Sequence, residues 1–254
     1  MAAYLLPRCM SSLPALSCRR QWTKHPPAVL SVLTRPTDNV EKASNSRTVY
    51  NDGWLDRIAI HHLSQIVQET TGLRNKKSGY ESLVEAARAA SHNFDSTQQR
   101  ELVVKALERA FPAPILAMVR MLLPNSKFAR AYFAVFTTVF FRWLVGPCEV
   151  REQDIQLGGQ ERNVVHIKKC RFLEESNCVG MCVNLCKMPS QTFIKKAFGM
   201  PVNMVPNYDD MSCEMIFGQD PPSASEDPAL KQPCYKLCDI LNIPSPAYLC
   251  FDKL

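Results

Sequence analysis

Residues 178–186 have the sequence CVGMCVNLC, in which three cysteines follow one another at a spacing of four. In a helix each such step turns about 400°, so Cys178, Cys182 and Cys186 are expected to line one face. Their neighbours are small or apolar apart from Asn184, which predicts a dry wall of thiols. Three thiols on one helix face are a candidate set of metal ligands.

Composition indicates a globular protein, because 254 residues with 46% hydrophobic content can bury a sizeable core. The net charge of +6 is concentrated near the N-terminus. Residues 1–37 contain five basic residues and no acid, which leaves the rest of the chain nearly neutral. Charge therefore gives no reason to expect a nucleic-acid partner.

The basic leader is rich in Ser, Ala, Pro and Leu and lacks the long apolar run of a secretory signal. We interpret residues 1–45 as a disordered transit peptide, with a plastid favoured over a mitochondrion. The alternative is a disordered N-terminus without a targeting role. Import into a plastid stroma would place the eleven cysteines in a reducing compartment.

Residues 50–147 are expected to be a helical region. Apolar residues at helical spacing predict a helix that begins after Asp52 and ends at Gly72. Two more helices are predicted from capping-box pairs, Ser78 with Glu81 and Ser96 with Gln99.

Two later segments, residues 115–123 and 128–145, are strongly apolar but interrupted by Arg120, Arg130 and Arg142. Neither reaches the roughly 20 uninterrupted apolar residues of a spanning helix. They are either core helices of a bundle or helices that dip into a membrane surface or line a pocket for a long lipid.

Residues 148–169 predict a hairpin whose turn lies at residues 157–160. A short helix from Ser190 to Gly199 and a strand at residues 212–217 are expected to follow. The fold class is therefore α+β, with an N-terminal helical bundle followed by a hairpin and a cysteine-rich mixed α/β region, residues 148–254. The helical and cysteine-rich regions are expected to form one compact unit.

Eight cysteines lie between residues 170 and 250: Cys170, Cys178, Cys182, Cys186, Cys213, Cys234, Cys238 and Cys250. A disulfide framework is disfavoured by the leader and by the spacing of four along a helix. Structural zinc usually takes pairs of cysteines two residues apart. Iron–sulfur ligation tolerates varied spacing and is modestly favoured over zinc, while plain core cysteines remain the alternative.

Asp209 and Asp210 lie close to Cys213 in sequence. As a catalytic hypothesis, one of them would deliver a proton or a hydrogen bond to a cysteine-bound centre. The alternative, which we favour, is that they are turn residues.

Several blocks in fixed order resemble the plastid β-carotene isomerase family, Dwarf-twenty-seven and its paralogues. They are CRFLE at 170–174, the thiol run with CKMPSQ at 186–191, GMP at 199–201, MVPNYDD at 204–210, SC at 212–213, FG at 217–218 and PC at 233–234. The resemblance is specific over about residues 165–240 and weaker through the helical half. Because the family includes paralogues of differing substrate, membership alone does not fix the reaction.

The resemblance implies an iron-dependent chloroplast enzyme, in the stroma or peripherally on a plastid membrane, that interconverts all-trans and 9-cis β-carotene. This would be the first step of strigolactone biosynthesis, with carotenoid cleavage enzymes acting downstream. Rotation about a polyene double bond requires a temporary loss of bond order, through electron transfer at iron, protonation, or thiol addition, and the electron-transfer route is favoured. The expected iron ligands are Cys178, Cys182 and Cys186, completed by Cys238 or Cys234, with Cys213 in reserve. The alternatives are a paralogue for another carotenoid and a non-enzymatic iron–sulfur or zinc module.

Overall fold

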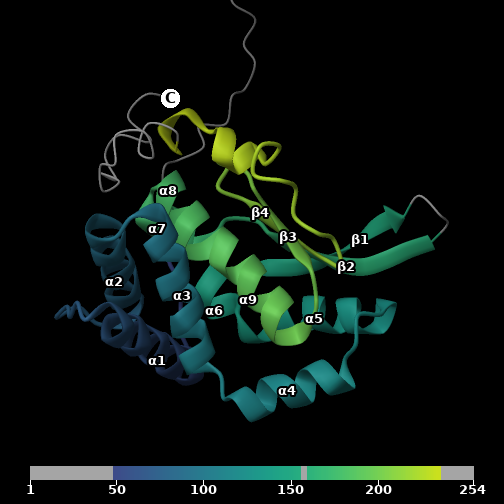
Figure 1. Cartoon of the computed structure of the whole chain (residues 1–254), viewed down its shortest axis with the longest axis horizontal. Helices are drawn as coiled ribbons and strands as arrows, with labels where there is room; N and C mark the ends of the chain where they lie inside the picture. The colour runs from purple at the N-terminus through teal and green to yellow at the C-terminus, as the bar shows by residue number, and fades with distance from the viewer. Residues whose placement is uncertain (1–47, 156–158, 236–254) are drawn as a thin grey trace, which may run out of the picture. The chain divides into compact units, whose positions relative to one another are not determined.

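The computed structural model describes residues 48–155 and 159–235, all within one compact unit, Ser46–Leu254. The predicted transit peptide, Cys238 and Cys250 lie outside these residues. Helices come first and a four-stranded antiparallel sheet follows (Figure 1), which confirms the predicted α+β class. The first six helices are α1 (Trp54–Thr71), α2 (Gly79–Asn93), α3 (Ser96–Ala110), α4 (Ala113–Leu122), α5 (Lys127–Phe140) and α6 (Arg142–Val145).

The predicted start and stop of α1 illustrate how the tertiary structure redirects a capping residue. Gly72 ends the helix in the left-handed conformation, with φ of 72°, as expected of a C-terminal glycine. Asp52, however, does not cap the helix, because its carboxylate instead receives two hydrogen bonds from the buried guanidinium of Arg171. Gly53 is the N-cap.

The two predicted capping boxes are wrong in detail although α2 and α3 lie where they were expected. Ser78 precedes α2 without a side-chain cap bond, and Glu81 forms an ion pair with Lys77 at 2.9 Å. At α3 the box is shifted by one residue, to Asp95 with Gln98. The carboxylate of Asp95 accepts from two backbone N–H groups, which a single hydroxyl at Ser96 would do less well.

The sheet has the order β1-β2-β4-β3, with β1 (Cys148–Ile155), β2 (Gly159–Ile167), β3 (Val202–Pro206) and β4 (Cys213–Phe217). The predicted hairpin is confirmed as β1 and β2, and the predicted strand at 212–217 as β4. In the register, Cys213 lies opposite both Ile167 and Pro206, at the start of the interior strand β4. The remaining elements are α7 (Arg171–Ser176), α8 (Val179–Met181), the π-helical segment η1 (Cys182–Lys187), α9 (Met188–Phe198) and the 3₁₀ turn η2 (Pro228–Lys231).

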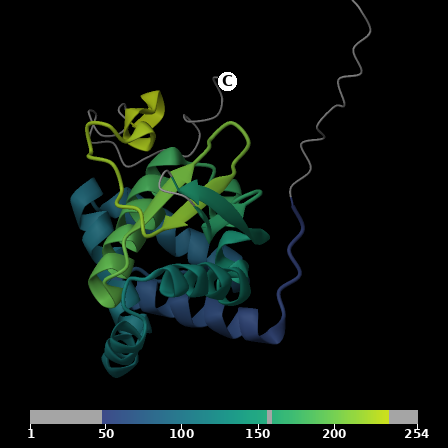
Figure 2. The ribbon, with the colours of Figure 1, turned by 90° about the vertical axis from the view of Figure 1, so that its right-hand side faces the viewer.

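α5 packs along the sheet, mainly on β2 (Figures 1 and 2), while α9 contacts α3, α4 and β3. The junction is aromatic: Phe133 of α5 stacks on Phe217 of β4 at 6.0 Å and contacts Phe198 of α9 at 5.2 Å. No helix among the described residues is long and apolar enough to cross a membrane.

The segment before α1 is tied to α7 through Glu174. Its carboxylate accepts from the N–H of Thr48 and the hydroxyl of Tyr50, each at 2.8 Å, and lies 2.7 Å from the ammonium of Lys169. Burial alone would raise the pKa of Glu174, but these partners outweigh it and lower the pKa to about 2. The ionised carboxylate therefore stabilises the fold.

We predict that acid weakens this attachment in a defined window. Because the folded pKa lies below the unfolded value of about 4.5, the stabilisation is present above pH 4.5 and is lost as the pH falls towards 2. Glu174→Gln is expected to lower the free energy of unfolding at pH 7 and to flatten its dependence on pH between 4.5 and 2. Urea unfolding at a series of pH values measures both effects. If the free energy of unfolding of the variant fell as steeply between pH 4.5 and 2 as that of the parent protein, Glu174 would not be the group responsible.

Candidate active site

The helix that carries the thiol run widens at that run. In η1 the N–H of Met188 donates to the carbonyl of Val183, five residues back, which is the π-helical pattern. The expected uniform helix from 178 to 186 is therefore not what forms, because Cys178 is the extended N-cap of α8 and the wide turn begins at Cys182. Such wide turns are costly on their own and are frequent at functional sites.

Side chains from other parts of the chain form buried hydrogen bonds with the wide turn. The side-chain oxygen of Asn184 accepts from Nε of Arg100 at 3.0 Å and from the hydroxyl of Tyr235 at 3.2 Å. Arg100 also donates to the Tyr235 hydroxyl at 2.8 Å. Asn184, the one polar residue of the run, thus joins η1 to α3 and to the end of the described chain.

Four thiols line one small cavity of about 10 Å³: Cys170, Cys182, Cys186 and Cys213. The N–H of Cys170 donates to the carbonyl of Met211 at 2.7 Å, which brings it beside Cys213. The Tyr208 hydroxyl lies 4.0 Å from the sulfur of Cys182. This cluster joins two of the three run thiols with two from elsewhere in the chain.

The other predicted metal ligands within the described residues do not line the thiol cavity. Cys178 is fully buried and does not line this cavity, Cys234 is half-buried near the end of the described residues, and Cys238 lies outside them. Cys170 was not among the predicted ligands. It opens the CRFLE block that carried the family resemblance, and that block was the available signal.

The four thiols share a desolvated environment that favours the protonated form. Burial, followed by the neighbouring Cys170, raises the pKa of Cys182 to about 12, although Tyr208 acts in the opposite direction. Burial also raises the pKa of Cys170, Cys186 and Cys213. We therefore treat the clustered sulfurs as neutral thiols at neutral pH.

A buried ion pair borders the thiol cavity. Lys187, the last residue of η1, lines the cavity and forms an ion pair with Asp227, and both side chains are 3% exposed. The other carboxylate oxygen of Asp227 accepts from the N–H of Ala229 at 3.0 Å and so caps η2. The pair fastens η2 to the wide turn.

A metal site is not preformed in this arrangement. Within residues 48–155 and 159–235, no three His, Cys, Asp or Glu side chains are placed to hold one metal ion. The four neutral thiols would have to move and ionise to do so. The predicted ligand set stays a prediction.

A larger apolar chamber adjoins the thiols. It has a volume of about 220 Å³ and is enclosed by α4, α5, α9 and the sheet. Most of its wall residues are aromatic, aliphatic or methionine, and Thr137, Ser190 and Cys186 carry a hydroxyl or a thiol. The others are Leu107, Phe111, Ile115, Leu116, Val119, Tyr132, Phe133, Phe136, Phe141, Leu144, Val145, Phe193, Ile194, Phe198, Met204, Met215 and Phe217.

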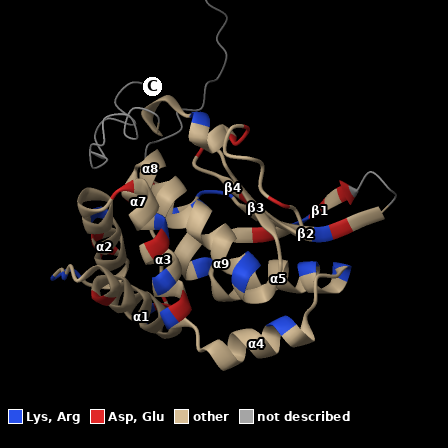
Figure 3. Cartoon of the chain, in the orientation of Figure 1, with Lys and Arg blue, Asp and Glu red and all other residues tan. Residues whose placement is uncertain are grey.

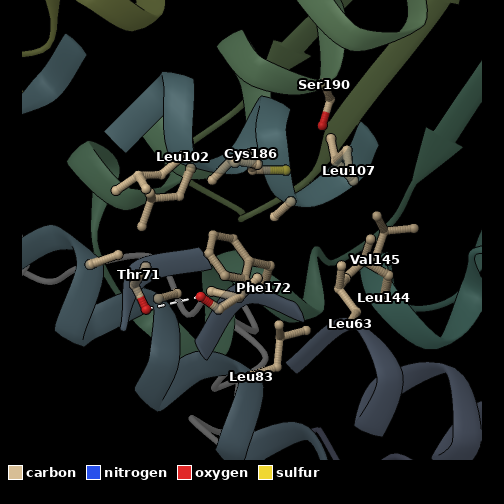
Figure 4. A pocket seen from close by; sticks show the side chains of 16 residues that line it. Leu63, Thr71, Leu83, Leu102, Leu107, Leu144, Val145, Phe172, Cys186 and Ser190 are labelled. Carbon is tan, nitrogen blue, oxygen red and sulfur yellow. Dashed lines mark hydrogen bonds between the residues drawn. The ribbon is translucent and has the colours of Figure 1, made fainter. Parts of the chain in front are cut away.

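Cys186 stands where three cavities meet. It lines the thiol cavity, the 220 Å³ chamber and a second apolar cavity of about 90 Å³ between α1, α2 and α3. Figure 4 shows it at this second cavity, beside Leu107 and Ser190 and across from Phe172. A ligand in the apolar chamber therefore has one thiol within its walls.

Asp209 and Asp210 lie in an exposed turn and line none of these three cavities. Hydrogen bonds from Ser212 lower the pKa of Asp210, which keeps it ionised rather than ready to donate a proton. Asp209 donates its own N–H to the side chain of Asn207. Their catalytic role stays a prediction that this geometry does not support.

Comparison with known proteins identifies the family. The chain is 59% identical over 244 residues to a protein of Medicago truncatula named beta-carotene isomerase D27, chloroplastic, covering 94% of this chain and 95% of that protein. The chain belongs to the beta-carotene isomerase D27 family. The D27 protein of Arabidopsis thaliana, also named chloroplastic, is 46% identical over 206 residues, covering 80% of this chain and 78% of that protein.

The D27-like C-terminal family model matches residues 143–226. This D27 segment contains the four clustered thiols and the whole sheet, whereas α4 and α5, which wall the chamber, lie before it. No solved structure matches the chain.

Proposed function

We propose that this D27 protein is a chloroplast carotenoid cis/trans isomerase that interconverts all-trans and 9-cis β-carotene. The names of its relatives support the substrate and the compartment. The observation that carries the proposal is Cys186, a thiol in the wall of a largely apolar chamber. In the pathway this would be the first step of strigolactone biosynthesis, with carotenoid cleavage enzymes as the consumers of the product.

The chamber fits part of a long hydrocarbon. Its 220 Å³ is below the roughly 300–1,000 Å³ of sites that enclose a drug-sized ligand. A C40 carotenoid therefore enters by one end, and the double bond that gives the 9-cis isomer lies close to one ring. Entry of a single ring with its adjoining polyene would bring that bond into the chamber, whose walls include Cys186.

The thiol of Cys186 offers one way to lower the order of the polyene double bond that must rotate. As the sulfur of Cys186 bonds to one polyene carbon, its proton passes to the neighbouring carbon, and the former double bond becomes a single bond that rotates freely. Reversal breaks the C–S bond and returns the proton to sulfur, so the enzyme is regenerated without net oxidation. The step needs the protonated thiol, because Cys186 supplies both the sulfur and the proton, and burial raises the pKa of Cys186 and so favours that form.

Iron dependence is a further part of the proposal and rests on the number and spacing of the thiols. Cys170, Cys182, Cys186 and Cys213 are the described residues nearest to a common ligand set. Iron bound there would supply one-electron chemistry as another way to lower the bond order.

We predict that the full chain, purified without oxygen, converts all-trans β-carotene into a mixture containing the 9-cis isomer. The isomer ratio is measured by chromatography, and the absorption spectrum and metal content are recorded on the same sample. A brown iron protein that is inactive on β-carotene but active on another carotenoid would show that the substrate is that other carotenoid. A zinc protein inactive on every carotenoid tested would favour the non-enzymatic module.

The variant Cys182→Ser tests whether the isomerase reaction depends on bound iron. Loss of metal and activity together is the result expected if the cluster holds iron. Unchanged activity in a metal-free protein would remove iron from the proposal and leave the isomerase in place.

A further inference from the structure

An exposed apolar face covers the outside of the chamber. α5 presents Phe128, Tyr132, Val135 and Val139 to solvent at i, i+4, i+7 and i+11, a single stripe along the helix that is between 44% and 70% exposed. α4 has no buried residue, and its Met121 and Leu122 are 83% and 67% exposed. Helices that are apolar on both sides normally lie in a protein interior or in lipid.

The charges around this face have one sign. Between Glu108 and Glu149 the chain has no acidic residue, and Figure 3 shows α4 and α5 with basic segments in blue and no acidic segment in red. Arg109 and Arg130 are paired with Glu69 and Glu161. The remaining three cations, Arg120, Lys127 and Arg142, form no ion pair with a carboxylate of the described residues.

Two of these cations lie at the ends of the helix that carries the apolar stripe, since Lys127 begins α5 and Arg142 follows its end. Arg120 lies on α4, where its guanidinium donates to the carbonyl of Lys196 on α9 at 3.2 Å, and all three are exposed residues. A second copy of the chain seated on this face would bring like charges together at a cost. A surface of anionic headgroups over an apolar layer satisfies both the cations and the exposed side chains.

The mouth of the chamber opens in the same face. Ile115 of α4 and Tyr132 of α5 both line the chamber, yet they are 50% and 44% exposed. The chamber therefore reaches the surface between these two helices. α4 packs mainly on α9, and Pro112 and Pro124 bracket it.

We propose that the α4–α5 face docks onto an anionic membrane surface, with Met121, Leu122 and the α5 stripe in the lipid and the chamber mouth facing it. An apolar molecule dissolved in the bilayer then reaches Cys186 without crossing water. Docking itself does not depend on the isomerase reaction, so the two can fail separately.

The test uses vesicles of phosphatidylcholine and phosphatidylglycerol without carotenoid, some made with brominated lipid that quenches tryptophan fluorescence on contact. In the full chain, Met121→Trp is expected to add quenched fluorescence. Ala224→Trp is expected to add fluorescence that is not quenched, because Ala224 is an exposed residue of the loop before η2, and the yellow segment that contains this loop lies at the other end of the molecule from α4 (Figures 1 and 2). Because both variants share residues 1–47, binding through the basic leader contributes equally to both. Equal quenching of the two, or of neither, would overturn the proposal.

Two further variants separate the apolar and charged contributions. Met121→Ser with Leu122→Ser is expected to weaken vesicle binding at least about tenfold, since both side chains are already exposed and the fold loses little. Lys127→Gln with Arg142→Gln is expected to weaken binding at low salt and to reduce its salt dependence. Unchanged vesicle binding in both double variants would overturn the proposal. It would also be overturned if the parent protein formed dimers in size-exclusion chromatography and the double serine variant lost the dimers but still bound vesicles.

Discussion

Replacing Cys186 with alanine is expected to lower the rate of carotenoid isomerisation at least about 100-fold, because it removes the one thiol that residues 48–155 and 159–235 place in the chamber wall. The substitution removes a single sulfur from a half-buried position, so the folded structure and the apolar walls should persist. The measurement is the initial rate of 9-cis formation, compared at equal amounts of folded protein judged by circular dichroism.

The matched control is Cys148→Ala. Cys148 is also half-buried, but it lies on β1 and lines none of the three cavities around Cys186. Its loss should leave the rate within about twofold of the parent protein. If Cys186→Ala retained the parent rate, thiol addition would be excluded, and the reaction would have to proceed through iron or through an acid.

The second large effect is expected on stability. Lys187→Met should lower the free energy of unfolding by about 3–5 kcal/mol, because it leaves the carboxylate of Asp227 buried without a counter-charge. The same loss should release η2, whose first turn Asp227 caps. Urea unfolding followed by circular dichroism measures the change.

Lys195→Met provides the comparison. Lys195 pairs with Asp220 at 2.6 Å, but both side chains are more than 60% exposed, so this variant should lose at most about 1 kcal/mol. Similar losses in the two variants would show that the Lys187–Asp227 pair is not desolvated in solution. The double variant Lys187→Met with Asp227→Leu should recover part of the stability, since it removes both buried charges together.

The sequence predicts local elements of this fold well. Apolar periodicity and Gly72 place α1, and the alternation before and after residues 157–160 places the hairpin. Capping was less predictable, because a capping side chain has competitors from distant parts of the chain. Asp52 pairs with Arg171, 119 residues away, and no local pattern reveals that partner.

The sequence predicted that the candidate site is a cluster of thiols, but it did not predict which cysteines form the cluster. The spacing of four places Cys182 and Cys186 together, yet the regular helix it implies would also have included Cys178. The structure recruits Cys170 and Cys213 through a backbone hydrogen bond and a strand register, both of which arise only from tertiary pairing. The chamber likewise combines α3, α4, α5, α9 and the sheet, so no single stretch of sequence could indicate it.

The wide turn of η1 also limits how this protein can change. A π-helical turn accommodates one residue more than the regular helix around it, so deleting a single residue there would restore the ordinary pattern. The flanking helical segments would keep their relative orientation, because the wide turn absorbs the extra residue, but the two thiols within the turn would change their positions relative to each other. Cys182 and Cys186 could no longer both reach Cys170 and Cys213. The number of residues in 182–187 is therefore constrained as well as their identity, and active members of the family should keep the length of this segment.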